Sequence, residues 1–206
     1  MDRRVERGRA TREHLVAAAT DLFAEHGYDH TSIDAVLEKT GVSRGSLYHH
    51  FSSKQALFEA AVHRLEAQVG EAVTAEALAA GDPDPAAALR AGCLAWIRLA
   101  GDPVVRRVLL IDAPAVLGWR RWREIEEQYA FGTTKEVVHM AAEQGRLPLE
   151  VVDPLAHMVL ASVNELALLI ALSDDVPAAQ ASAQAAVDEF FQRLLPSAKP
   201  ATRRRR

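Results

Sequence analysis

A stretch of polar side chains near the N-terminus has the composition of a surface that binds a polyanion. Between residues 39 and 58 the chain contains no acid, and it carries Arg44, Lys54 and the adjacent His49 and His50. Side chains of this kind contact phosphates and the edges of bases. Charge alone leaves open a chance fluctuation on a solvated surface, so the interpretation depends on the elements that position these residues.

The charge of the whole chain hides this basic stretch. The 206 residues carry a net charge of −4, but residues 1–54 are neutral and residues 55–198 carry −9. Residues 199–206 hold five basic residues and no acid. An acidic chain with an acid-free stretch near one end indicates a polyanion partner for that end only.

Two short helices are predicted to position the basic stretch. Thr31 is expected to cap the first, Gly41 ends it after about seven residues, and Ser43 caps a second helix that reaches Phe51. Two short helices joined by a turn with glycine describe a helix-turn-helix unit, whose second helix is small enough to enter a DNA major groove. An ordinary helical hairpin with solvated polar residues is the alternative.

The flanking segments are also predicted to be helical. A first helix begins after Thr11 and ends before Gly27, and the capping box from Ser52 to Gln55 starts a fourth helix. The arginines of the first twelve residues are interpreted either as a mobile arm that reaches the DNA backbone or as a frayed, charged terminus. These arginines are Arg3, Arg4, Arg7, Arg9 and Arg12.

Longer helices follow, separated by glycine and proline. They are expected at 104–113, from Trp119 to about Gln144, from after Pro154 to about Ser173, and from Pro177 to Pro196. No segment shows the alternating pattern of a strand, so the predicted fold class is all-α. We predict three parts: 1–54, 55–196, and a basic disordered tail at 197–206 that includes the solubilising Arg203–Arg206.

A resemblance to a known family covers residues 11 to about 62. The matching strings are Thr31-Ser32-Ile33-Asp34-Ala35-Val36, Gly41-Val42-Ser43-Arg44-Gly45-Ser46-Leu47-Tyr48-His49-His50-Phe51 and Lys54-Gln55-Ala56-Leu57, preceded by Leu22-Phe23 and Gly27-Tyr28. They resemble the signature of the tetracycline-repressor (TetR) family. The resemblance implies an all-helical homodimer with an N-terminal three-helix DNA-binding domain and a C-terminal domain for ligand binding and dimerisation. It implies DNA contacts by Thr31, Arg44, Gly45, Ser46, Tyr48, His49 and Lys54.

The C-terminal part contains a group of aromatic and polar residues that could line a small-molecule cavity. The predicted ligand-binding residues are Trp96, Asp112, Trp119, Trp122, Tyr129, His139 and Asn164. His139 and Glu143, four residues apart, share one helix face and could bind a ligand together. The alternatives are that the rings fill the core and that the polar pair is exposed.

The last two predicted helices are apolar over a wide face, which favours a dimer interface built as a four-helix bundle. The predicted interface residues are Met158, Val159, Ser162, Leu166, Leu169, Phe190, Phe191 and Leu194. Burial within one subunit is the alternative, and it accounts for part of this face only.

The function predicted from these features is a ligand-responsive transcriptional repressor that binds a palindromic operator as a homodimer. An activator or a partner-binding regulator without a small-molecule inducer is the alternative. An enzyme that uses His139, Glu143, Asp112 or His157 is the rival from another class, but no nucleophile motif or metal-ligand spacing supports it.

No cofactor, metal or membrane partner is predicted, and the expected location is the bacterial cytoplasm at the nucleoid. A single cysteine, Cys93, excludes an internal disulfide framework. The longest apolar run, Leu166–Leu172, is too short to span a bilayer.

Overall fold

A computed structural model describes residues 3–80 and 84–194, and within these ranges every regular element is a helix. The elements are α1 (Arg3–His30), α2 (Ile33–Thr40), α3 (Arg44–His50), α4 (Lys54–Ala79), α5 (Pro85–Leu99), α6 (Pro103–Val105), η1 (Arg106–Asp112), α7 (Ala113–Leu117), α8 (Trp119–Glu143), η2 (Leu149–Val151), α9 (Val152–Leu172) and α10 (Val176–Leu194). The all-α prediction is therefore confirmed. The predicted tail with Arg203–Arg206 and the predicted stop at Pro196 lie outside the described residues.

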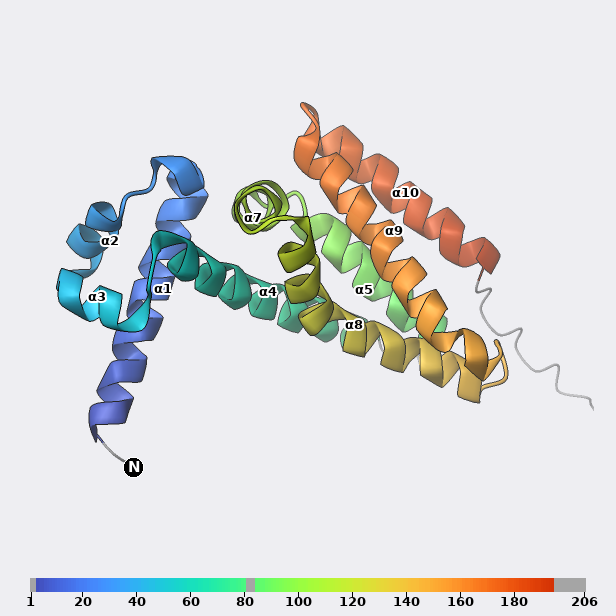
Figure 1. Cartoon of the computed structure of the whole chain (residues 1–206). Helices are drawn as coiled ribbons and strands as arrows, with labels where there is room; N and C mark the ends of the chain where they lie inside the picture. The colour runs from blue at the N-terminus through green and yellow to red at the C-terminus, as the bar shows by residue number, and fades with distance from the viewer. Residues whose placement is uncertain (1–2, 81–83, 195–206) are drawn as a thin grey trace, which may run out of the picture.

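The helices form two groups that α4 connects (Figure 1). Helices α1, α2 and α3 lie at one end, and α4 runs from them to the C-terminal helices. There α4 packs on α5 and α8, α8 packs on α9, and α10 packs on both α5 and α9. Because α4 belongs to both groups, the two groups share one continuous core.

The first helix begins at Arg3, earlier than predicted, so the interpretation as a mobile N-terminal arm is wrong. Arginine and glutamate are good helix formers, and pairs four residues apart add to helix stability. Arg9 Nε donates to Glu13 Oε1 at 2.8 Å in such a pair. The basic N-terminal residues therefore extend a rigid rod.

Gly27 turns the chain sharply near the end of α1. Its φ of 77° and ψ of 167° lie in a region that is essentially limited to glycine. The turn allows the next ring, Tyr28, to pack on Phe23 and Phe58, at ring-centroid distances of 5.8 and 5.0 Å. The predicted glycine end of the first helical segment is thus confirmed.

Two predicted caps differ by one residue from the observed caps. Ser32 caps α2, because the hydroxyl of Thr31 is buried and donates to the Gly27 and Leu22 carbonyls at 2.8 and 3.1 Å. Ser53, and not Ser52, caps α4 by accepting from the Ala56 N–H at 3.1 Å.

The end of α2 and the start of α3 are as predicted. Gly41 ends α2 in the left-handed conformation with φ 67°, and Ser43 caps α3 by accepting from the Ser46 N–H at 3.2 Å. The helix-turn-helix unit is therefore confirmed as a structural element.

The predicted helix at 104–113 is three connected segments. A π-helical segment, η1, occupies Arg106–Asp112 between α6 and α7. The wider turn of η1 lies against α1. A hydrophobic pattern that repeats every 3.6 residues cannot predict a π-helical turn. The predicted loop that ends at Pro154 is also shorter than expected, because Pro154 lies in the first turn of α9, where proline is tolerated.

Helix α9 with the preceding η2 is the one segment of the described chain long and apolar enough to cross a membrane by length and composition. In the most apolar window of this segment, 44 % is buried inside the protein, where α9 packs on α8, α10 and η1. These contacts are those of a core helix.

Replacement of Gly27 by alanine tests the turn. We expect Gly27→Ala to lower the free energy of unfolding by about 1–3 kcal/mol, because a β-carbon is strained in this conformation. The added carbon would also lie 1.9 Å from the Arg107 guanidinium nitrogen Nη2, so that side chain must move. Urea unfolding of both proteins measures the difference.

Gly45→Ala is the control, because a β-carbon there meets nothing within 4 Å and Gly45 has no positive φ. Equal stability of the Gly27 and Gly45 variants would contradict this account of the turn.

Candidate nucleic-acid interface and internal cavity

Helix α3 is anchored by its apolar side and presents its polar side to solvent. Leu47 is fully buried and Phe51, which caps the helix, is 4 % exposed. Arg44, Tyr48 and His49 are exposed on the other side. The sequence predicts this separation of a buried and an exposed side, since Leu47 and Phe51 are four residues apart and therefore lie on the same face of the helix.

The exposed side of α3 has the donors that DNA recognition needs. Tyr48 is 46 % exposed with its hydroxyl available, and the backbone at Gly45 is open, with nothing near a β-carbon position. Ser46 is half-buried, and its N–H is used by the Ser43 cap. Arg44 pairs with Asp34 on α2, a partner that the sequence analysis did not identify. A phosphate that binds Arg44 must compete with this carboxylate or share the guanidinium with it.

Two of the predicted DNA-contacting residues have structural partners. The Thr31 side chain is 2 % exposed, and its hydroxyl donates inside α1, so the structure gives this side chain a packing role. Lys54 is half-buried; its Nζ lies 4.2 Å from the centre of the Tyr28 ring and 3.5 Å from the Asp29 carbonyl oxygen. Lys54 therefore lies beside the turn that follows Gly27.

A carboxylate joins the N-terminal helices to the C-terminal helices. Asp112, at the end of η1, accepts from the Tyr28 N–H at 2.8 Å and from Arg107 Nε at 3.2 Å through the same oxygen, Oδ2. Asp112 is 8 % exposed, and Gly27 lies directly against Arg107. Asp112 is not among the residues that line the cavity described below, because its carboxylate connects the two parts.

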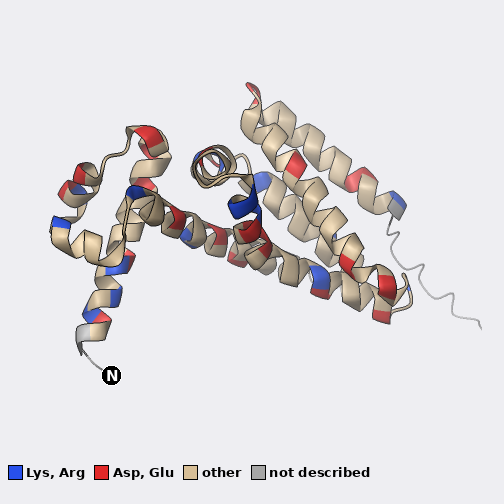
Figure 2. Cartoon of the chain, in the orientation of Figure 1, with Lys and Arg blue, Asp and Glu red and all other residues tan. Residues whose placement is uncertain are grey.

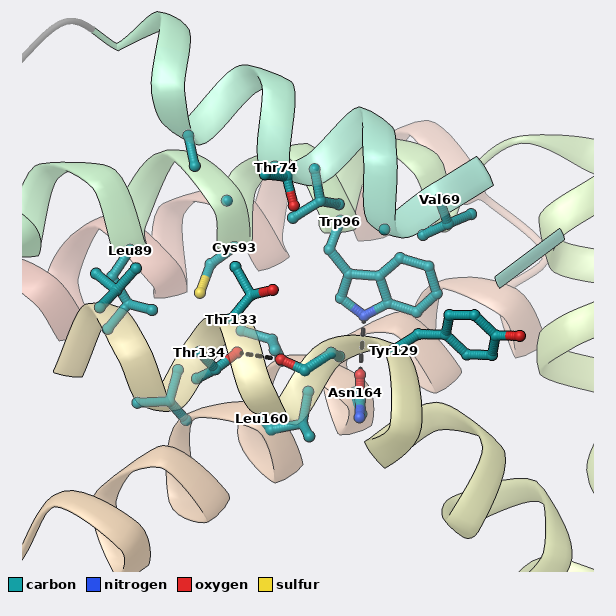
Figure 3. A pocket seen from close by; sticks show the side chains of 18 of the residues that line it. Val69, Thr74, Leu89, Cys93, Trp96, Tyr129, Thr133, Thr134, Leu160 and Asn164 are labelled. Carbon is teal, nitrogen blue, oxygen red and sulfur yellow. Dashed lines mark hydrogen bonds between the residues drawn. The ribbon is translucent and has the colours of Figure 1, made fainter. Parts of the chain in front are cut away.

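The C-terminal helices enclose a cavity of about 100 Å³ between α4, α5, α8 and α9 (Figure 3). Its wall is mostly apolar, with Trp96, Tyr129 and Asn164 among the lining residues. Trp96 Nε1 donates to Asn164 Oδ1 at 3.0 Å, which is the dashed contact between the two labelled side chains. Three of the seven predicted ligand-binding residues thus come together here.

The other predicted lining residues lie elsewhere. Trp122 is in the core with 1 % exposure, and Trp119 is 58 % exposed on the surface. His139 is half-exposed and lies 3.5 Å from the exposed Glu143, which is the solvated pair given as the alternative. In the described ranges no group of three or more metal-ligating side chains occurs.

Two buried acids in the cavity wall were not identified from the sequence. Glu66 on α4 and Glu126 on α8 are 6 % and 4 % exposed, and both line the cavity. Burial and then the neighbouring Glu126 charge raise the pKa of Glu66 to about 8. Burial is also the main reason that the pKa of Glu126 is raised to about 7, opposed by Arg123 and assisted by Glu127.

The signal for these acids is their position in an apolar pattern. Glu66 follows Val62 by four residues and precedes Val69 by three, and Glu126 follows Trp122 by four. All three neighbours are buried. An acid at such a position is either exposed at the edge of the stripe or buried with a function, and the sequence alone does not separate the two.

The outer face of α9 and α10 carries several large exposed apolar side chains, with the exposed Glu165 among them, and Figure 2 shows only short charged stretches along the two ribbons. Met158, Leu169 and Leu172 are 61 %, 56 % and 72 % exposed. Of the other predicted interface residues, Val159 and Phe191 are buried within the subunit, Leu166 and Phe190 are half-buried, and Ser162 is exposed. A groove between the two helices is lined by Ser162, Leu166 and Phe190 among others. The Leu194 side chain lies outside the described residues.

Family models match both parts of the chain. The model described as "Bacterial regulatory proteins, tetR family" matches residues 15–61, and "Tetracyclin repressor-like, C-terminal domain" matches residues 86–194. The chain belongs to the tetracycline-repressor family. These two matches confirm the resemblance inferred from the sequence. The family consists of non-enzymatic transcriptional regulators.

Curated relatives match different shares of this TetR-family chain. The HTH-type transcriptional repressor AcnR of Corynebacterium efficiens is 37 % identical over 68 residues, which are 33 % of this chain and 36 % of AcnR. The chain thus matches about a third of the length of this relative. The A-factor receptor protein of Streptomyces griseus is 25 % identical over 188 residues, or 89 % of this chain and 62 % of that protein.

Solved structures of similar proteins match nearly the whole chain. A TetR-family transcriptional regulator from Pectobacterium atrosepticum has a TM-score of 0.81 at 29 % identity, and the match covers 97 % of this chain and 100 % of that one. RolR in complex with resorcinol has a TM-score of 0.69 at 20 % identity, with 93 % and 98 % covered. The second similarity is one of fold.

The buried acids make stability depend on pH. The folded state holds a proton on Glu66 up to a pH of about 8, whereas the unfolded chain releases it near 4.5. Stability therefore falls as the pH rises between these values, by about 1.4 kcal/mol per pH unit for one proton. We expect Glu66→Gln to remove this dependence, so that its advantage over the parent grows from pH 5 to pH 8 in urea unfolding.

Glu71→Gln, an exposed position on the same helix, is the control and should follow the parent curve. Parallel stability curves for the Glu66 variant and the parent would contradict the burial of a protonated carboxyl.

Proposed function

We propose that this regulator is a repressor that binds a palindromic operator as a homodimer and leaves it when a small molecule occupies the C-terminal cavity. The observation that carries the proposal is the exposed side of α3, which presents Arg44, Tyr48 and His49 from a firmly anchored helix without an acid among them. A major groove admits one such helix, and each subunit then reads one half-site. The expected location is the cytoplasm.

The apolar surface of α9 and α10 supports the homodimer. Large exposed apolar side chains are expensive to leave in water, and a two-fold copy of the same surface covers them without any other partner. Met158, Leu169 and Leu172 are exposed on this surface, and the small Ser162 lies between Met158 and Leu169 together with the exposed Glu165. A dimer formed there holds two α3 helices at a fixed spacing, which a palindrome with half-sites roughly 34 Å apart would match.

The connection through Asp112 supports release by a ligand. Helix α4 lines the cavity with Glu66 and begins directly after α3, and Asp112 ties the end of α1 to η1. A ligand that moves α4 or η1 therefore changes the position of α3 in the dimer. By thermodynamic linkage, operator DNA and such a ligand weaken each other's binding by the same factor.

Operator binding tests the proposal. The probe is the intergenic DNA that flanks the gene, with footprinting to locate the site and fluorescence anisotropy to measure affinity. We expect Arg44→Ala to weaken binding by about 1–3 kcal/mol per half-site, and Tyr48→Phe by about 1 kcal/mol, because each loses a base or phosphate contact.

The control is Arg120→Ala on α8, whose side chain is 94 % exposed and distant in sequence from the helix-turn-helix. This variant should bind as the parent does, and all variants should remain dimers. The proposal fails if the purified protein binds flanking DNA no more tightly than random DNA. A footprint upstream of the promoter, rather than over it, would favour the activator.

The dimer surface is tested by one charge. We expect Leu169→Glu to convert the dimer into a monomer in light scattering after size-exclusion chromatography, because a carboxylate would be desolvated against an apolar partner. Leu78→Glu on α4 is the matched control, since Leu78 is also exposed, at 76 %. A dimeric Leu169 variant, or a monomeric parent, would contradict this interface.

A further inference from the structure

The charge in the cavity wall is acidic only. Of the described residues that line the cavity, two are ionisable acids, Glu66 and Glu126, and none is lysine, arginine or histidine. A carboxylate ligand would therefore place a third acid among two buried ones with no cation in the wall. An anion would find no cation in this wall and would be repelled by either acid when that acid ionises, so the cavity disfavours an anion.

Buried polar atoms without a hydrogen bond in the same wall indicate that a ligand belongs there. Asn164 Nδ2 is buried without a hydrogen-bond partner, and Glu126 Oε2, also buried, has no hydrogen bond beyond its 3.4 Å ion pair with Arg123 Nη1. Asn164 and Glu126 are only 3 % and 4 % exposed. Buried polar groups are normally satisfied, because each orphaned group costs free energy. One atom accepts and the other donates, since the Asn164 oxygen already accepts from Trp96.

The groups around the two acids would not compensate their negative charge once both carboxyls ionise. Arg123 lies 3.4 Å from Glu126 but also 3.4 Å from Glu127, so its single charge is divided between two acids. On α4, the nearby His63 is paired with the Tyr129 hydroxyl at 3.0 Å through Nδ1, and its Nε2 is 3.9 Å from Glu59. A cation inside the cavity would compensate the negative charge of Glu66 and Glu126, which Arg123 and His63 do not.

We infer that the effector is a hydrophobic amine, whose ammonium group binds between Glu66 and Glu126 and whose apolar body lies against Trp96 and the aliphatic wall. This inference rests on the proposed function, since it names the ligand class of the same cavity. The Asn164 amide donates to an oxygen or ring of the bound molecule. The wall offers aromatic and aliphatic contacts from Val69, Leu89 and Tyr129.

Binding is coupled to proton release. In the empty cavity a protonated carboxyl, COOH, faces the ligand, and on binding it becomes a carboxylate paired with the ammonium while one proton passes to the buffer. The affinity for the amine should therefore rise with pH between 6 and 8. The two carboxyls lose their protons in this range, because their pKa values are about 7 and 8. An alcohol of the same shape releases no proton.

The experiment compares three probes of one skeleton by isothermal titration calorimetry of the full dimer: 2-phenylethylamine, 2-phenylethanol and 3-phenylpropanoate. We expect the amine to bind about tenfold or more tightly than the other two at pH 7. Its heat should differ between phosphate and Tris buffers, as proton release requires. Glu66→Gln and Glu126→Gln should each reduce the preference for the amine, with Glu71→Gln as the unchanged control.

The inference is overturned if the carboxylate binds as tightly as the amine, or if the amine does not bind at millimolar concentration. Operator release is measured separately by anisotropy, which distinguishes the two proposals. Amine binding without release would remove the ligand-released repressor and keep the ligand class. Release of the operator by 3-phenylpropanoate would keep the ligand-released repressor and remove the amine as the ligand class.

Discussion

The carboxylate of Asp112 holds the two halves of the molecule in register. One of its oxygens accepts from the Tyr28 backbone N–H and from the Arg107 guanidinium, in a site that is almost closed to water. The N–H that it satisfies belongs to the turn after Gly27, which directs the chain from α1 toward α2. The orientation of the helix-turn-helix relative to the cavity therefore depends on a few buried polar contacts.

Helix α4 provides the second connection between the halves. Its first two turns pack on the end of α1, where Lys54 and Phe58 both contact the Tyr28 ring, and its middle supplies Glu66 to the cavity. A helix is stiff along its axis, so a displacement at Glu66 is carried to the start of the helix. In the homodimer that we propose, this geometry would connect a ligand in the cavity to the spacing of the two α3 helices.

The N-terminal part was largely predictable because its signals are local. Gly41 and the Ser43 cap fix α2 and α3 through short-range hydrogen bonds, and the apolar residues of α3 recur at a helical spacing. The caps at Ser32 and Ser53 were missed by one residue, because neighbouring hydroxyls compete for the same backbone donor. For α2, the choice between Thr31 and Ser32 depends on the Thr31 hydroxyl, which is already bonded to the Gly27 carbonyl of α1.

The cavity was predictable only in part, because its residues come from four helices whose contacts no local pattern encodes. Of the predicted aromatic residues, Trp96 and Tyr129 line the cavity, whereas Trp122 lies in the core and Trp119 on the surface, since a ring suits a core or a surface as well as a cavity. Glu66 and Glu126 look like ordinary helix acids until α4 and α8 are seen to face each other. The π-helical turn of η1 likewise depends on tertiary packing.

The most direct test of the central claim is reciprocity between the cavity and the operator. The affinity of 2-phenylethylamine is measured for the free dimer and for the operator-bound dimer, and operator affinity is measured with and without saturating amine. Our account predicts that both affinities fall by the same factor. Equal affinity of the amine for free and operator-bound protein would contradict it.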